Sequence, residues 1–130
     1  MEEGIISYLE QFLNTQYGEL YTYTASTDDF IEIYATGKLD ESIRYCLIRI
    51  GIDVNTEQIY LSNIFIPHDM KHKGIGEKMI YVVYTAAKKY DYDVFLVQLT
   101  DDFREELLNR GALETEEDGT LQIVEEMNLF

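Results

Sequence analysis

Two glycines one residue apart, Gly74 and Gly76, stand where a strand-like stretch of the sequence gives way to a helix-like stretch. The first backbone N–H groups of a helix have no partner within the helix, and the helix dipole favours an anion beside them. Glycine also lets a ligand approach the backbone closely. The pair is preceded by Lys71, His72 and Lys73. These residue types in this order are what a phosphate or pyrophosphate site requires.

A tight turn explains the same glycines without a ligand, because a strand-to-helix turn needs glycine in any case and loop lysines are solvated. The spacing does not match the dinucleotide-binding pattern G-x-G-x-x-G, since Met79 holds the place of the third glycine. It does not match the P-loop pattern either, because no Gly-Lys-Ser/Thr follows. The local sequence leaves both the phosphate site and the simple turn open.

Few residues near this turn could carry acid–base chemistry. His68 could accept a proton near neutral pH, or it could be a solvated loop histidine. Tyr60 and Asn63, on or near the strand expected over 58–66, could order a water relay. Glu57 begins that strand and stands further away. No carboxylate or cysteine completes a set of metal ligands around the histidines, so we expect no metal.

The composition limits the class of protein. The chain has 130 residues, 46% of them hydrophobic, which fits one domain over 1–130 with a substantial core. No apolar run reaches the ~18 residues of a membrane span, and no signal-peptide pattern opens the chain. The single cysteine, Cys46, lies in an apolar run. We expect it to be a small buried residue rather than a nucleophile, in a reducing, cytoplasmic environment.

The chain is strongly acidic. Ten Lys and Arg residues stand against 25 Asp and Glu residues, giving a net charge of −15. This charge repels nucleic acid and anionic membranes and attracts cationic partners, so an anion site must be built locally against the overall field. Eleven tyrosines include Tyr21 and Tyr23 on one strand face. They indicate a half-exposed sheet or, alternatively, a surface for an acceptor, a protein or a second copy of the chain.

The elements that position the glycine turn follow from hydrophobic periodicity. Apolar residues at helical spacing predict a first helix around 5–13, which Gly18 ends. Strand-like runs then follow at 20–24, 30–35, 43–52 and 58–66. The last of these runs is long and mostly apolar, which fits a central strand buried on both faces.

The second half of the chain alternates helix and strand. A strong helical stripe runs from Ile75 to Tyr90, and 94–99 reads as a strand. A short helix with Asp101-Asp102 as its cap follows, and a hairpin over 112–124 ends the pattern. The expected fold class is α/β with a mixed, largely antiparallel sheet, a strand–helix–strand crossover and a C-terminal hairpin.

The stretch from Ile64 to Ile80, IFIPHDMKHKGIGEKMI, resembles the acyl-CoA signature of the GNAT superfamily of N-acyltransferases. That signature is an apolar strand and a short loop, then R/Q-x-x-G-x-G/A at the start of a long helix. Lys71 stands where Arg or Gln is usual. The order of elements over about 43–124 also resembles the family core, whereas the first 40 residues match it less clearly.

The resemblance implies an N-acetyltransferase that moves an acetyl group from acetyl-CoA directly to a primary amine on a cationic protein or small molecule. Backbone N–H groups near the glycine turn would hold the CoA pyrophosphate, and the strand end would pair with pantetheine. The cofactor-binding residues would be Ile64, Phe65, Ile66, Lys71, His72, Lys73, Gly74, Ile75, Gly76 and Thr100. The catalytic candidates are His68, Asn63 and Tyr60.

The second half of the family signature, N-x-x-A-x-x-x-Y-x-x-x-G-F, is not matched. Aligned on Gly111, the chain has Thr100 for Asn, Phe103 for Ala, Leu107 for Tyr and Ala112 for Phe. The tyrosine usually proposed to protonate the departing thiolate is therefore absent. Phe103 and Leu107, four residues apart, are expected to be core contacts. The alternative function is a catalytically inactive, GNAT-like acidic protein that binds a basic protein partner.

Overall fold

The computed structural model describes residues 1–70, 74–117 and 119–127, over which one seven-stranded mixed sheet is formed. The strands are β1 (Tyr21–Thr27), β2 (Ile31–Gly37), β3 (Arg44–Asp53), β4 (Gln58–Ser62), β5 (Asp93–Leu96), β6 (Leu113–Glu114) and β7 (Leu121–Ile123). The helices are α1 (Glu2–Tyr17), η1 (His68–Met70, a 3₁₀ turn), α2 (Ile75–Lys88) and α3 (Asp101–Asn109).

The sheet runs in the order β1-β2-β3-β4-β5-β7-β6. Only β4 and β5 are parallel among these neighbours, and α2 is the crossover that connects them. The expected fold class, a largely antiparallel mixed sheet with one crossover and a C-terminal hairpin, is confirmed. Over the described residues, no helix is long and apolar enough to cross a membrane.

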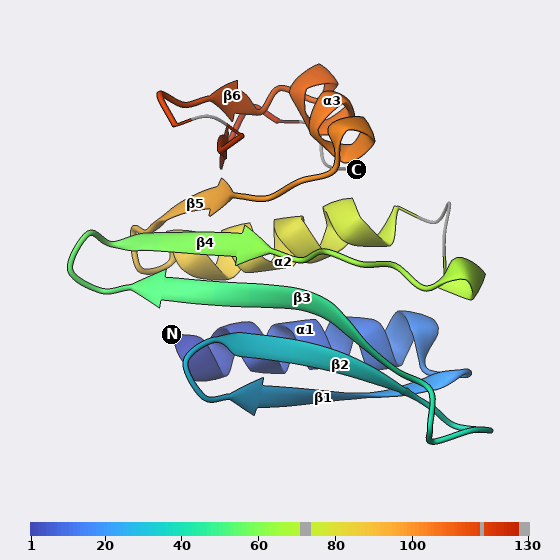
Figure 1. Cartoon of the computed structure of the whole chain (residues 1–130). Coiled ribbons are helices and arrows are strands. Elements are labelled where there is room, and N and C mark those ends of the chain that lie inside the picture. The colour runs from blue at the N-terminus through green and yellow to red at the C-terminus, as the bar shows by residue number, and fades with distance from the viewer. Residues whose placement is uncertain (71–73, 118, 128–130) are drawn as a thin grey trace.

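Two helices cover one face of the sheet (Figure 1). There α1 lies behind β1–β3 and α2 lies behind β4 and β5, while α3 sits beside the C-terminal hairpin. The predicted helical stripe of α1 is confirmed, because Ile5, Leu9 and Leu13 are fully buried. Each such side chain contributes about 1.5–3 kcal/mol by leaving water. The core is therefore the layer between the two helices and the sheet.

The predicted long strand is shorter and more one-sided than expected. β4 ends at Ser62, and residues 63–67 leave the ladder. The prediction that it is buried on both faces is wrong, because helices cover only one face there. Ile59 and Leu61 face the core, whereas Tyr60 lies half-buried on the opposite face and stacks on Phe95, with ring centroids 5.6 Å apart.

The tyrosines of β1 are buried rather than half-exposed. Tyr21 and Tyr23 are 6% and 4% exposed, because each phenol finds a partner inside. The Tyr23 hydroxyl donates to the Tyr17 carbonyl at 2.7 Å, and the Tyr21 hydroxyl donates to both carboxylate oxygens of Asp69 at 2.9 and 3.0 Å. Burial, more than any other cause, raises the pKa of both phenols to about 12. The Tyr21–Asp69 contact ties η1 to β1.

Cys46 is half-buried on β3 rather than fully buried. Its Sγ lies 3.9 Å from a carboxylate oxygen of Glu32. Burial first, and then the charge of Glu32, raise the pKa of the thiol. A thiol held in its protonated form is a poor nucleophile, so this environment favours a structural role for the residue.

The parallel strands β4 and β5 separate at two residues with unusual backbone geometry. The strands pair from Gln58 with Asp93 to Leu61 with Leu96. Two residues further along each chain, Asn63 and Gln98 have φ values of 52° and 57°. These left-handed conformations turn the segments that follow β4 and β5 away from each other, which ends the pairing of the two strands. Beyond these residues, the segment after β4 continues toward η1, and the segment after β5 leads to α3 (Figure 1).

Replacing Gln98 with glycine is expected to leave the free energy of unfolding unchanged or to raise it by up to ~1 kcal/mol. Glycine adopts a positive φ without the roughly 1–2 kcal/mol that a side chain costs there, although it gains entropy in the unfolded chain. Gln98 is exposed, so little packing is lost. Urea unfolding measures the change. The control is Ser62→Gly, at the last residue of β4, which is paired with Arg49 of β3 and should lose about 0.5–1 kcal/mol. Equal losses in both variants would contradict the strain assigned to residue 98.

Candidate functional site

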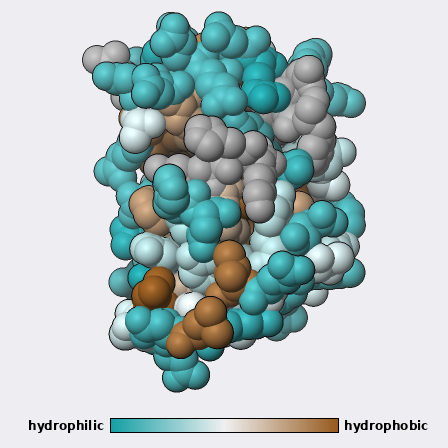
Figure 2. All heavy atoms as spheres, turned by 90° about the vertical axis from the view of Figure 1, so that its right-hand side faces the viewer, coloured by the Kyte–Doolittle hydropathy of each residue, from teal (hydrophilic) through white to brown (hydrophobic). Residues whose placement is uncertain are grey.

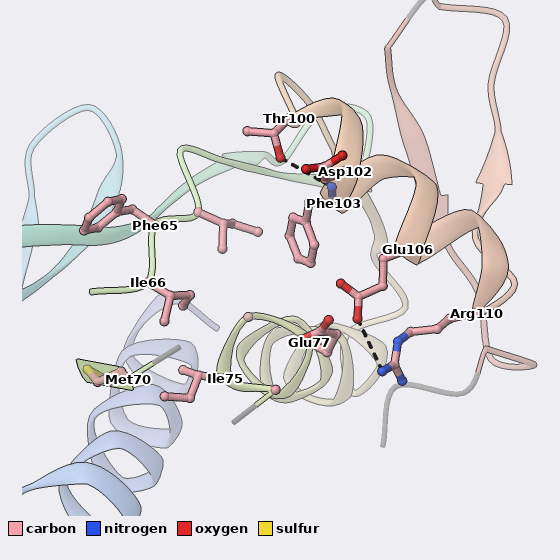
Figure 3. Close-up of a pocket in the computed structure, with 13 residues that line it drawn as sticks. Phe65, Ile66, Met70, Ile75, Glu77, Thr100, Asp102, Phe103, Glu106 and Arg110 are labelled. Atoms are coloured by element: carbon pink, nitrogen blue, oxygen red, sulfur yellow. Dashed lines mark hydrogen bonds and ion pairs between the residues drawn. The ribbon is translucent and has the colours of Figure 1, made fainter. Parts of the chain in front are cut away.

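A cavity of about 660 Å³ opens where β4 and β5 separate (Figure 3). Its walls come from the chain after β4, the start of α2 and one face of α3. The lining residues are Ile64, Phe65, Ile66, Met70, Gly74, Ile75, Gly76, Glu77, Thr100, Asp102, Phe103, Glu106 and Arg110. This volume lies within the range of small-molecule and cofactor sites.

The N-terminus of α2 forms the floor of the cavity. Gly74 is the N-cap, and its φ of 67° is a conformation that favours glycine. No side chain caps the helix from this position, and the first helical hydrogen bond runs from the Lys78 N–H to the Gly74 carbonyl at 3.1 Å. The N–H groups of Ile75, Gly76 and Glu77 therefore precede the helical ladder. They present the positive end of the helix dipole to the cavity.

The second glycine has a packing role that requires no ligand. A Cβ atom on Gly76 would lie 3.3 Å from Cζ of Phe103 and 3.7 Å from Cγ2 of Ile64. Phe103 points from α3 toward the start of α2 (Figure 3). Glycine at 76 therefore lets α3 and the strand end approach α2 closely. The glycine pair combines a backbone requirement at 74 with a close approach at 76.

The chain after β4 offers an unpaired backbone edge to the cavity. The Phe65 N–H donates to the Leu47 carbonyl of β3 at 2.9 Å. Alternate residues of an extended chain direct their N–H groups to opposite sides, so the N–H groups of Ile64 and Ile66 face away from β3. Within the described residues, neither has a backbone hydrogen-bond partner. An extended ligand carrying amide groups could pair with this edge.

The cavity also contains carboxyl groups that the sequence analysis did not anticipate. Asp102, Glu106 and Glu77 line it, against one guanidinium, Arg110, in the described part of the wall. Glu77 is only 7% exposed, and when protonated it hydrogen-bonds to Glu106. Its carboxylate also accepts its own backbone N–H. The one available signal was an acidic residue in the first turn of α2, which the helix dipole explains without a partner.

The pKa of Glu77 is raised. Burial is the largest cause, followed by the hydrogen bond to Glu106 and then the charge of that neighbour. Arg110 acts in the opposite direction, and it pairs with Glu106 at 3.5 Å (Figure 3). The hydrogen bond to Glu106 and the negative charge of that neighbour both favour the protonated form of the buried Glu77, so one proton on the pair is favoured.

Seven of the ten predicted cofactor-binding residues line this cavity, namely Ile64, Phe65, Ile66, Gly74, Ile75, Gly76 and Thr100. They come from three segments that the fold brings together. The other three predicted residues, Lys71, His72 and Lys73, lie outside the described residues. The cofactor roles of all ten stay predictions.

The three predicted catalytic residues do not line the cavity. His68 is exposed at the start of η1, and Asn63 is exposed where the strands separate. The Tyr60 hydroxyl donates to the side-chain oxygen of Gln58. The structure therefore does not place the three on the cavity wall, and their roles stay predictions.

The start of α3 differs from the predicted cap. Thr100 is the N-cap, and its hydroxyl accepts the Phe103 N–H at 3.4 Å, so the prediction of Asp101-Asp102 as the cap is wrong by one residue. Leu107 is fully buried, which confirms it as a core contact. Phe103 packs against the core but also lines the cavity, because its ring projects from the exposed first turn of the helix.

Comparisons with known proteins add little to this geometry. No protein-family model and no curated protein sequence matches the chain. Among solved structures, the chain is similar to one described as a "putative acetyltransferase from Agrobacterium tumefaciens". The two are 15% identical, with a TM-score of 0.43, and the match covers 93% of this chain and 88% of the other. The function proposed below rests on the cavity itself.

Glu77→Gln is expected to raise the thermal midpoint by a few degrees at pH 7 and by nothing at pH 4. The Glu77 carboxyl group holds its proton more tightly in the folded protein than in the unfolded chain, where its pKa is near 4.5. Stability is therefore lost as the pH rises from 4.5 through the raised pKa, and glutamine, which cannot ionise, avoids that loss. Thermal melts from pH 4 to pH 8 measure the difference.

The exposed Glu105→Gln on α3 controls for the change in net charge, and its melting curve should stay close to that of the wild type. A constant difference between Glu77→Gln and the wild type at every pH would show that the raised pKa of Glu77 is not the cause.

Proposed function

We propose that this protein is an N-acetyltransferase that binds acetyl-CoA in the cavity and transfers the acetyl group to a primary amine. The observation that supports this most directly is the separation of β4 and β5 at Asn63 and Gln98. That separation leaves an unpaired strand edge and a helix N-terminus without a side-chain hydrogen bond from its N-cap residue, both facing one cavity.

Acyl-CoA has the chemical groups that this arrangement would accept. Its pantetheine arm is extended and carries two amides, which could pair with the backbone edge at Ile64 and Ile66. Its pyrophosphate would lie against the N–H groups at the start of α2, where the helix dipole favours an anion. The resemblance of residues 64–80 to the GNAT signature supports the same placement.

Direct transfer requires two proton movements. The amine must lose a proton as its nitrogen attacks the thioester carbonyl, and the thiolate must gain one as the C–S bond breaks. Leu107 is buried and carries no proton to give, so solvent water would protonate the thiolate. His68, exposed two residues before the cavity-lining Met70, is the proposed base, with Asn63 and Tyr60 as proposed parts of a water relay.

The proposed acceptor is a cationic amine, on a protein or on a small molecule. The net charge of −15 attracts cations over long range. The face of the molecule seen in Figure 2 carries mainly hydrophilic side chains over the described residues. The negative electrostatic field from this net charge would raise the concentration of a protonated amine near the protein before the amine reaches the cavity.

A second candidate function is a binding protein of the same fold without catalysis. The carboxyl groups of Glu77, Asp102 and Glu106 favour it, because they oppose an anion in the cavity. The buried Leu107 favours it as well. Such a protein would use its acidic surface to bind a basic partner and would not need acyl-CoA.

Isothermal titration with acetyl-CoA at low salt tests the first proposal. We expect micromolar binding to the wild type and affinity at least about tenfold weaker in Gly76→Glu, because the new carboxylate would repel the pyrophosphate and its Cβ would lie 3.3 Å from the Phe103 ring. Gly4→Glu is the matched control, since it adds the same charge to α1, far from the cavity, where a Cβ meets nothing within 4 Å.

Thermal melts would first establish that both variants fold. No binding to the wild type, or equal affinity in Gly76→Glu and Gly4→Glu, would refute the acetyl-CoA site. No binding would also favour the second candidate, whereas binding without thiol release in the presence of a panel of primary amines would leave the acetyl-CoA site in place and refute transfer to those amines.

A further inference from the structure

The cavity proposed for an anion contains a buried acid in its floor. Glu77 belongs to the first turn of α2, the same turn whose N–H groups would hold a phosphate. It is 7% exposed and lines the cavity next to Gly76. A carboxylate in this place would compete with a ligand phosphate for the positive end of the helix dipole, and it would repel that phosphate directly.

A second carboxyl group lies against the first. Glu106, from the facing helix α3, also lines the cavity and accepts a hydrogen bond from protonated Glu77. Figure 3 shows Glu77 and Glu106 on facing helices, with Phe103 closing the side nearer the strand end. A carboxyl pair in this geometry can hold one proton between its oxygens, as paired acids in other proteins do.

We propose that the cavity binds its anionic ligand together with a proton, which Glu77 and Glu106 hold between them. Glu77 is then the residue that sets the pH range in which the site accepts an anion. This inference rests on the proposed acyl-CoA site and adds its regulation. At low pH the carboxyl pair carries at most one charge, and the helix N-terminus is open to phosphate. At high pH both carboxylates are charged and the ligand is repelled.

The charged groups around the pair are few in the described part of the wall. From α3, Arg110 pairs with Glu106 and partly offsets the acid charges, while Asp102 adds another carboxylate. From α2, Lys78 follows Glu77 and does not line the cavity. Among the described residues of the segment after β4, those that line the cavity have apolar side chains. The described wall is therefore acidic overall, and a proton on the pair would lower its negative charge toward an anion.

Thermodynamic linkage makes the inference measurable. If the ligand binds more tightly to the protonated pair, then binding the ligand must raise proton affinity by the same factor. Acetyl-CoA binding should therefore take up protons, and the affinity for acetyl-CoA should fall by as much as about tenfold per pH unit above the raised pKa of Glu77. A site without the carboxyl group at residue 77 should lose this pH dependence.

The experiment is calorimetric titration of the full chain with acetyl-CoA at pH 6 and pH 8. At each pH it is run in two buffers of different ionisation enthalpy, because the difference in observed heat gives the number of protons taken up. Glu77→Gln is the test variant, and the exposed Glu105→Gln is the matched control. Comparing proteins removes the contribution of the ligand's own phosphates, which is the same in every titration.

We expect the wild type and Glu105→Gln to take up protons and to bind more weakly at pH 8 than at pH 6. Glu77→Gln should take up fewer protons and bind at least about tenfold more tightly than the wild type at pH 8. Glu106→Gln provides a second test on the other helix and should also reduce the uptake. Its failure to fold would not affect the Glu77 result.

Two outcomes would overturn the inference, and they are distinguishable. Equal proton uptake and equal pH dependence in the wild type and Glu77→Gln would remove the role of the carboxyl pair while leaving the acetyl-CoA site intact. No binding to either protein at pH 6 or pH 8 would remove the proposed function, and the proton coupling with it.

Discussion

The parting of two parallel strands is the constraint on which the rest of this molecule depends. The pairing of β4 with β5 extends as far as Leu61 and Leu96, which are both fully buried, and the two strands then diverge. Left-handed backbone at Asn63 and Gln98 directs the two strands apart, at a cost of roughly 1–2 kcal/mol at Gln98 and less at Asn63, because asparagine adopts this conformation more readily. The buried pairing before that point offsets this cost. Without the divergence there would be no cavity and no unpaired strand edge.

The two glycines of the turn serve different parts of this arrangement. Gly74 supplies a positive φ that starts α2 facing the gap, and Gly76 removes a side chain where Phe103 must lie. Neither role requires a ligand, and both leave backbone N–H groups directed at the cavity. The conformation that packing imposes on this turn is therefore also one that could hold a phosphate. The ligand would use what the packing already provides.

The acidic side chains of the cavity oppose the anionic ligand that its shape and backbone favour. A chain with a net charge of −15 has placed carboxyl groups even beside the helix N-terminus where an anion is expected. Burial raises the pKa of Glu77 because the charged form loses its hydration, and Glu106 raises it further. Shape and backbone favour an anion, whereas the side chains oppose it. The protonation of one carboxyl pair decides between these tendencies.

The sequence by itself determined the elements and most of their order. The apolar stripes of α1 and α2, the glycine turn and the C-terminal hairpin are local patterns, and local patterns depend on residues a few positions apart. Through its resemblance to the acyl-CoA signature, the sequence also indicated seven residues that line one cavity. The tertiary structure decided the burial of Tyr21, whose partner Asp69 lies 48 residues away, and the one-sided burial of β4.

It also decided the pairing of Glu77 with Glu106, which come from different helices. These contacts depend on which faces the packed elements present to each other, and no local spacing records that choice.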